Sequence, residues 1–177
     1  MDKPKRYHPL LVSLHWLIAL MIITSLIIGM FSLKWMPNNP AKLLPLGFHM
    51  ATGILILLLM LIRLAVRLLT KKPEPATAGN RFLDIIGQLT HYALYFFAIL
   101  MALSGFTTAL QADLFNIVFR ASGAPLPEDF FVYPVRYVHG YVALILIALI
   151  ILHFGAAMYH QFFRKDNLLS RMWFGQQ

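Results

Sequence analysis

Residues 135–163 read VRYVHGYVALILIALIILHFGAAMYHQFF, and this stretch decides the fold. Its apolar residues follow one another without the alternation of a barrel strand, over more than the roughly 20 residues that a helix needs to cross a bilayer. Lipid offers no hydrogen-bond partners, so the backbone of such a run must satisfy itself, as a helix does. The stretch therefore predicts a transmembrane helix, with His139 near its start and His153 beyond its middle.

Three further apolar segments have the same character, at about residues 10–31, 46–69 and 85–110. Of the 177 residues, 59% are hydrophobic and only 12% are charged, whereas a soluble domain carries roughly 25% charged residues. The first segment follows basic residues, as a secretory signal does, but it is too long for a signal core, and we expect it to be retained. The fold prediction is an all-α integral membrane four-helix bundle, a single domain over residues 1–177.

The basic residues predict the orientation of the bundle. Eleven of the 15 lie in the N-terminus, the second loop with its flanks, and the C-terminus, and four lie in the other two loops: Lys34, Lys42, Arg120 and Arg136. Cytoplasmic loops carry the excess of Lys and Arg. We therefore expect both termini in the cytoplasm of a multi-pass protein of the bacterial inner membrane. Because the charges flank apolar segments, membrane lipid rather than nucleic acid is the expected partner.

The absence of cysteine narrows the cofactor chemistry. With no cysteine in the chain, disulfides, iron–sulfur clusters, thiolate ligation of haem and covalent attachment of haem are excluded. Seven histidines remain in a strongly apolar chain, and polar groups within membrane spans tend to mark function.

The spacing of two histidines on the fourth segment suggests two sites at different depths. His153 follows His139 by fourteen residues. Over that interval a helix turns about 40° less than four full turns, so both side chains lie on one face, and it rises about 21 Å, so they lie about 21 Å apart along the axis. The first helix starts in the cytoplasm, which puts His15 at the depth of His153. The second helix starts outside, which puts His49 at the depth of His139. We predict the pairs His15 with His153, and His49 with His139.

Two opposed neutral imidazoles are suitable axial ligands for a six-coordinate haem iron. The four histidines therefore predict two haem b groups and electron transfer across the bilayer. Interhelical hydrogen bonding is the alternative for any single histidine, and zinc would need three or four clustered ligands. His91 is open to several roles: a bond to a haem propionate, contact with a quinone, a bond to a neighbouring helix, or competition with His15 or His153.

Two arginines and two outlying histidines complete the set of polar groups. Arg63 and Arg67, one turn apart, either snorkel as topology anchors or pair with haem propionates. His8 and His160 lie near the ends of spans and are expected at the interface.

Several motifs resemble the bacterial cytochrome b561 family, within the wider group of diheme cytochrome b subunits that includes hydrogenase membrane anchors. The resemblance covers nearly the whole chain. The motifs that carry it are Leu14-His15-Trp16; His49-Met-Ala-Thr-Gly53 followed by Arg63-Leu-Ala-Val-Arg67; Gly87-Gln-Leu-Thr-His91 followed by Tyr95; His139-Gly140, His153 and His160; and Lys165-Asp166-Asn-Leu-Leu-Ser-Arg171-Met172.

The resemblance implies both ligands and a reaction. In that family four histidines from helices one, two and four bind two haems b, and they match His15, His49, His139 and His153. The implied activity is an oxidoreductase that oxidises an external donor and reduces membrane quinone, with superoxide as the leading donor and ubiquinone as the acceptor. Lys34, Lys42, Arg120 and Arg136 would attract such a small anionic donor, although Asp113, Glu128 and Asp129 nearly cancel their charge.

Two other classes of function remain open on the sequence alone. One is a non-catalytic electron-carrier or anchor subunit for a soluble dehydrogenase or hydrogenase. The other is a haem-free membrane scaffold or transporter whose histidines bridge helices or relay protons. A reduced-minus-oxidised absorption spectrum separates the last class from the first two.

Overall fold

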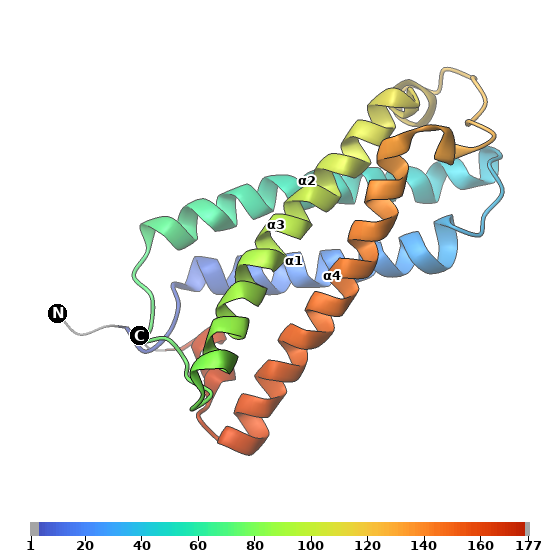
Figure 1. Cartoon of the computed structure of the whole chain (residues 1–177). Helices are drawn as coiled ribbons and strands as arrows, with labels where there is room; N and C mark the ends of the chain where they lie inside the picture. Colours follow the sequence, from blue (N-terminus) through green and yellow to red (C-terminus); the bar gives the residue numbers. More distant parts are fainter. Residues whose placement is uncertain (1–3, 176–177) are drawn as a thin grey trace.

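The computed structural model describes residues 4–175, which form helices and connecting segments with no strand. Four helical spans are long and apolar enough to cross a membrane, as predicted. They are α1 (Pro9–Ile27) continued by the π-helix η1 (Ile28–Leu33), the 3-10 turn η2 (Pro40–Lys42) leading into α2 (Leu43–Leu69), α3 (Arg81–Gln111), and α4 (Pro134–Met158) continued by the π-helix η5 (Tyr159–Arg164). Figure 1 shows their arrangement.

Local sequence signals set where these helices begin. Pro9 and Pro134 occupy first turns, where the missing backbone N–H of proline has no partner to lose. The side chains of His8 and Asn80 cap α1 and α3 by accepting hydrogen bonds from the backbone N–H groups of Leu10 and Phe82, at 3.3 and 2.8 Å. Such caps satisfy amide groups that would otherwise be orphaned at a helix start.

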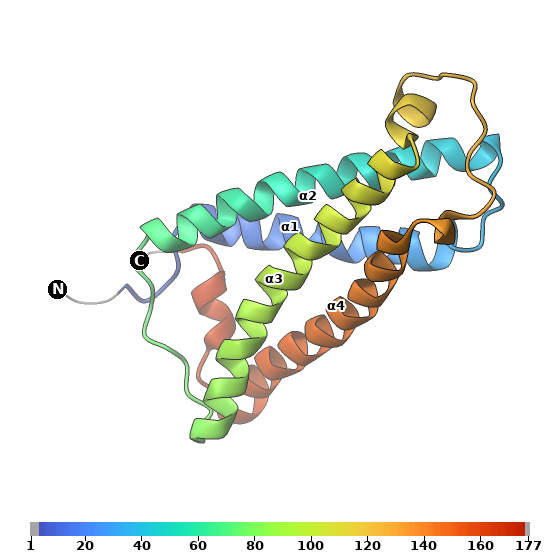
Figure 2. The ribbon, with the colours of Figure 1, turned by 45° about the horizontal axis from the view of Figure 1, so that its top comes forward.

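The spans pack as two crossed layers. In Figures 1 and 2, α1 lies beside α2, α3 lies beside α4, and the two layers diverge toward the end of the bundle that holds both chain termini. A buried apolar cluster joins the layers near the crossing and contains Leu14, Ile18, Ile56, Met60, Ala98, Val142 and Leu146. We call the two ends of the bundle the termini end and the loop end.

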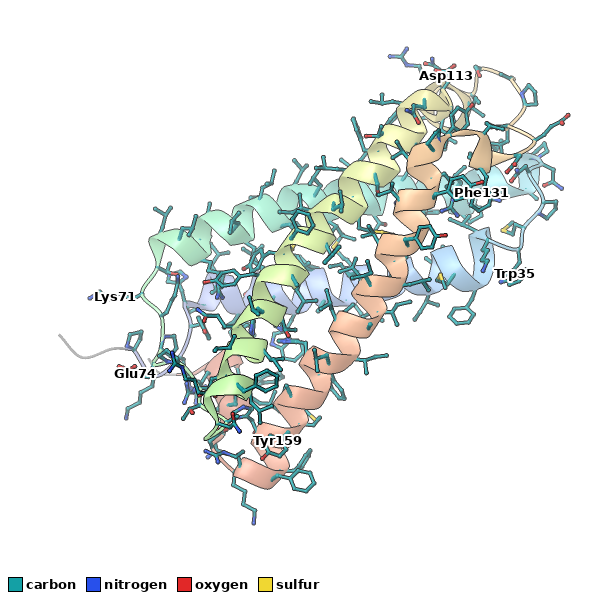
Figure 3. The ribbon with its side chains drawn as sticks, viewed as in Figure 1. Trp35, Lys71, Glu74, Asp113, Phe131 and Tyr159 are labelled. Atoms are coloured by element: carbon teal, nitrogen blue, oxygen red, sulfur yellow. The ribbon has the colours of Figure 1, made fainter. Side chains whose placement is uncertain are left out.

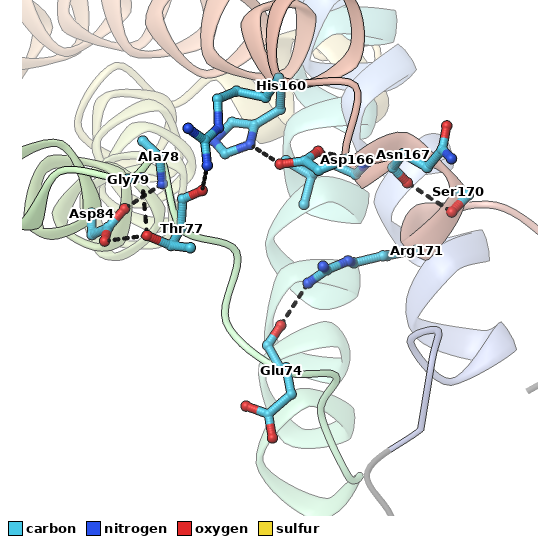
Figure 4. Close-up of polar contacts among 12 residues, drawn as sticks. Glu74, Thr77, Ala78, Gly79, Asp84, His160, Asp166, Asn167, Ser170 and Arg171 are labelled. Atoms are coloured by element: carbon cyan, nitrogen blue, oxygen red, sulfur yellow. Dashed lines mark hydrogen bonds and ion pairs between the residues drawn. The ribbon is translucent and has the colours of Figure 1, made fainter.

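The termini end gathers three segments that are distant in sequence. The backbone N–H of Tyr7 donates to the carbonyl of Arg171 at 3.1 Å, and Trp16 Nε1 donates to the carbonyl of Met172 at 2.8 Å. Arg171 in turn donates to the carbonyl of Glu74 in the second loop at 2.6 Å (Figure 4). The segments predicted to share one membrane side thus meet at one end of the bundle; that this side is the cytoplasm stays a prediction.

The loop end contains two short helical segments between α3 and α4. Residues 111–134 connect α3 to α4 and include the π-helix η3 (Phe115–Phe119) and the 3-10 turn η4 (Phe130–Val132). Their apolar side chains form a second core with the start of α2, containing Ala109, Ala112, Leu114, Ile117 and Leu126. Trp35, Asp113 and Phe131 mark this end in Figure 3, whereas Lys71, Glu74 and Tyr159 mark the other.

A single asparagine ties the first loop to the third at the loop end. Asn38 Nδ2 donates to the carbonyl oxygens of Pro127 and Glu128, both at 2.9 Å. Lys42 Nζ donates to Asn38 Oδ1 at 2.8 Å, which completes the polar contacts of the amide. These bonds hold the start of α2 against the segment that leads into α4.

Candidate functional site: two imidazole clusters

The first cluster, which we call the outer pair, joins α2 to α4 toward the loop end. The ring centroids of His49 and His139 lie 6.2 Å apart, and the rings are nearly perpendicular at 83°. A side-chain Cβ at Gly29 would lie 3.4 Å from His49 Cε1. The π-helical turn η1 therefore approaches the outer pair closely, and only a small residue leaves its ring in ordinary contact.

The ring of His139 is held by α3. Its Nδ1 lies 3.1 Å from the carbonyl oxygen of Met101 and 3.1 Å from the hydroxyl oxygen of Ser104. A Cβ at Gly105 would come within 2.9 Å of His139 Cε1. The α3 helix, which contributes no ligand to the predicted outer pair, thus fixes where one of the two rings lies.

The second cluster, which we call the inner cluster, lies toward the termini end and contains three imidazoles. The ring centroids of His15 and His153 are 6.2 Å apart with an interplanar angle of 77°. His91 on α3 lies closer to His153, at 5.1 Å and 86°. The structure therefore brings together the predicted pair and also the competitor.

Hydrogen bonds distinguish the rings of the inner cluster. The carbonyl oxygen of Gly87 lies 2.6 Å from His91 Nδ1 and can only accept, so Nδ1 carries hydrogen and Nε2 keeps its lone pair. Arg63 Nη2 lies 3.3 Å from His15 Nδ1 and can only donate. In the neutral ring of His15 the hydrogen therefore lies on Nε2, so this nitrogen must lose its hydrogen before it can bind a metal.

Arg63 lies inside the bundle, against His15 and Tyr95. Its guanidinium carbon is 4.9 Å from the centroid of the Tyr95 ring, and that of Arg67 is 5.7 Å from the same ring. Within residues 4–175, Arg63 Nε and the Tyr95 hydroxyl are buried without a hydrogen-bond partner. Buried polar atoms of this kind are costly unless something satisfies them, and an acidic group would satisfy both.

The outer pair fits a metal held between two imidazoles. An imidazole nitrogen binds a metal ion at about 2 Å, so two rings on opposite sides of one ion have centroids about 6 Å apart. The outer pair and His15–His153 both have this separation. His49 Nδ1 is buried without a partner, and a Cβ at Gly53, one turn further along α2, would meet nothing within 4 Å. An unpartnered ring nitrogen and an uncrowded position one turn away on the same helix therefore suit a bound group.

The zinc alternative has less support in the same region. Among the described residues, no group of three or more histidine or acidic side chains could hold one ion. Two separate imidazole pairs are the ligand pattern of iron in haem rather than of tetrahedral zinc.

His8 and His160 take structural roles. His8 caps α1. His160 was expected at the membrane interface, but it is buried, with only 9% of its surface exposed. Its Nδ1 donates a hydrogen bond to Asp166 Oδ2 at 2.6 Å (Figure 4). Burial opposes the charged form of Asp166, but hydrogen bonds from His160 and from the backbone of Leu168 outweigh it and hold the pKa of this carboxyl below its ordinary value. The pair ties the end of η5 to the C-terminal segment.

Met101, Ser104 and Gly105 are site residues that sequence reasoning missed. The available signal is the Ser104-Gly105 dipeptide in the middle of an apolar span, where small polar residues often mark close helix contacts. Met101 contributes its backbone carbonyl, so the identity of its side chain could not indicate this role.

Known proteins share sequence similarity with this chain over nearly its whole length. A family model described as "Prokaryotic cytochrome b561" matches residues 6–175. The chain is 24% identical to Cytochrome b561 homolog 2 of Escherichia coli (strain K12), over 97% of this chain and 93% of that protein. It is 26% identical to Cytochrome b561 homolog 1 of the same organism, over 94% of this chain and 96% of that protein.

Proposed function

The chain belongs to the prokaryotic cytochrome b561 family, and from that premise we propose that it holds two b-type haems and carries electrons between the two faces of the membrane. Membership makes it a multi-pass membrane protein of electron transfer whose family binds b-type haem. The number of haems, their ligands and the reaction partners are the content of the proposal.

The observation that carries the proposal is the separation of the paired rings. His49 and His139, on facing helices, have centroids 6.2 Å apart, and so do His15 and His153. Both distances suit two imidazoles that share one metal ion. We assign the outer pair to one haem and His15 with His153 to the other, with His91 as the competing ligand at the second site.

Bound haem b supplies reversible one-electron chemistry at its iron. The surrounding residues would orient it and set the charge of its environment. Arg63 and Arg67 present two cations around Tyr95 near the inner cluster, and we assign them to pairing with the acidic propionate groups. With both imidazoles of a pair as ligands, the iron would keep no open coordination position, so the arrangement favours electron transfer over oxygen binding.

The specific reaction that we propose is oxidation of a small anionic donor at the loop end and reduction of ubiquinone. With superoxide as the donor, two superoxide ions become two molecules of oxygen, and ubiquinone takes up their two electrons with two protons. Arg136 supports this choice, because it lies one turn before His139 and Gly140 and has no carboxylate partner among residues 4–175. Its guanidinium carbon lies 5.2 Å from the centroid of the Phe131 ring, and a cation near the outer pair without a carboxylate among the described residues favours approach of an anion.

Purification from cells supplied with haem, followed by haem quantification, tests the proposal. We expect two haems b per chain, b-type bands in the reduced-minus-oxidised spectrum, and reduction of ubiquinone by the isolated protein when superoxide is generated. One haem per chain would reject the paired sites. Two haems without donor-to-quinone turnover would leave the sites intact and reject the enzymatic reaction.

A further inference from the structure

The ring of His139 faces two hydrogen-bond acceptors on α3. Ser104 is 4% exposed, and its hydroxyl donates its one hydrogen to the carbonyl oxygen of Met101 at 2.9 Å. Toward His139 Nδ1, which lies 3.1 Å from each oxygen, both the hydroxyl and the carbonyl therefore offer lone pairs. His139 Nδ1 must carry hydrogen, because a bare nitrogen would face the carbonyl lone pair across 3.1 Å without a proton between them.

The consequence is a defined tautomer. With hydrogen on Nδ1, the neutral ring has its lone pair on Nε2, the atom that remains for a metal. A hydrogen bond from the other ring nitrogen also raises the basicity of a ligating imidazole and fixes its orientation. Gly105 contributes by its lack of a side chain, since a Cβ there would lie 2.9 Å from His139 Cε1.

We infer that Ser104, with the Met101 carbonyl and Gly105, forms a cradle on α3 that positions His139 and sets it to bind iron through Nε2. This inference rests on the proposed function. It assigns a task to α3, which supplies no ligand to the outer pair. It also makes the two sites unequal: His139 is held by acceptors, whereas His15 faces the donor Arg63.

The first test compares Ser104→Ala with Thr108→Val. Thr108 is a matched control, because it is a buried hydroxyl one turn along α3 that donates only to the carbonyl of Ser104 within its own helix. Haem release to excess apomyoglobin and the reduction potential of each haem are measured, and the outer haem is identified as the one lost in His139→Ala. Neither readout depends on turnover.

We expect Ser104→Ala to speed release of the outer haem about tenfold, the lower range found when such supporting hydrogen bonds are removed from metal sites. A less basic ligand disfavours ferric iron, so the potential of the outer haem should rise, by about 28 mV for a threefold change in the reduction equilibrium. The inner haem and both haems of Thr108→Val should behave as in the unmodified chain. Gly105→Ala should displace the ring and lower occupancy of the outer site alone.

Three outcomes would overturn the inference in a protein that does bind two haems. These are an unchanged outer haem in Ser104→Ala, equal changes in both haems, and an effect of Thr108→Val as large as that of Ser104→Ala. If the unmodified chain itself lacks the outer haem, the proposed function fails instead, so the two failures are distinguishable.

Discussion

Arg63 on α2 donates from Nη2 to His15 Nδ1 on α1 across 3.3 Å, so a fixed positive charge touches one ring of the inner cluster. Removing that charge should stabilise ferric relative to ferrous iron there. We expect Arg63→Gln to lower the potential of the inner haem by some tens of millivolts, about 30–60 mV. Redox titration followed by absorption measures the change.

A lysine variant separates the effect of the Arg63 charge from the effect of its hydrogen bond to His15. Arg63→Lys keeps the charge and should move the potential much less than Arg63→Gln. Arg67→Gln is the matched control, since Arg67 lies one turn further along α2 and contacts Tyr95 rather than His15. Equal shifts in the two glutamine variants would show that contact with His15 has no special effect.

If the outer pair binds one haem, substitutions at His49 and at His139, which are far apart in the sequence, should remove the same haem. His49→Ala and His139→Ala should each lose about one of two haems, and the double variant should lose no more, because residues that share one site are not additive. Haem per chain and the remaining spectrum measure this. His8→Ala, which affects only the cap of α1, should keep both haems. Loss of spectrally different haems in the two single variants would refute the pair.

The inner cluster allows a direct choice between ligands. His153→Ala should abolish the inner haem, and His15→Ala should do the same if His15 is its partner. His91→Ala should then keep the haem and alter only its potential. The reverse result, with the haem lost in His91→Ala and kept in His15→Ala, would assign His91 as the ligand, in line with the lone pair on its Nε2.

Asn38 should contribute more to stability than its partial exposure suggests. Asn38→Ala removes two donated bonds between the first and third loops and leaves Lys42 Nζ one acceptor fewer. We expect a loss of about 2 kcal/mol in the free energy of unfolding. Thermal unfolding in mild detergent measures it. Asn116→Ala is the control, because Asn116 bonds only within its own loop and should cost under about 1 kcal/mol; equal losses would contradict the bridging role.

The contact of Asp166 with His160 predicts a pH dependence. The pKa of Asp166 is lowered in the folded chain, so its stabilisation is complete above the unfolded pKa of about 4 and is lost as pH falls through the lower folded value. Asp166→Asn should therefore cost about 0.5–1 kcal/mol at pH 7, discounted for partial exposure, and nothing at the acid end. Thermal unfolding from pH 7 to 3 tests this. A difference that stays constant with pH would show that the carboxylate charge is not responsible.

The length and apolar character of the segments predicted the four spans, and helix rise predicted which histidines lie at the same level of the bundle, because both follow from the order and number of residues along the chain. It could not rank His15 against His91 as the neighbour of His153, since that depends on rotation about the helix axes and on packing between layers. The acceptors of His139 were out of reach for the same reason. In the third loop, the π-helix Phe115–Phe119 and its packing against the start of α2 became visible only in three dimensions.

The backbone partners of Tyr7 and Trp16 lie at Arg171 and Met172, so assembly of this molecule has a direction in time. Synthesis produces the first helix long before the segment that closes over its beginning. Until α4 has been made, the hydrogen bonds of Tyr7 and Trp16 to this segment cannot form. The contacts that join the start of α1 to residues 171–172 are therefore among the last that the growing chain can make.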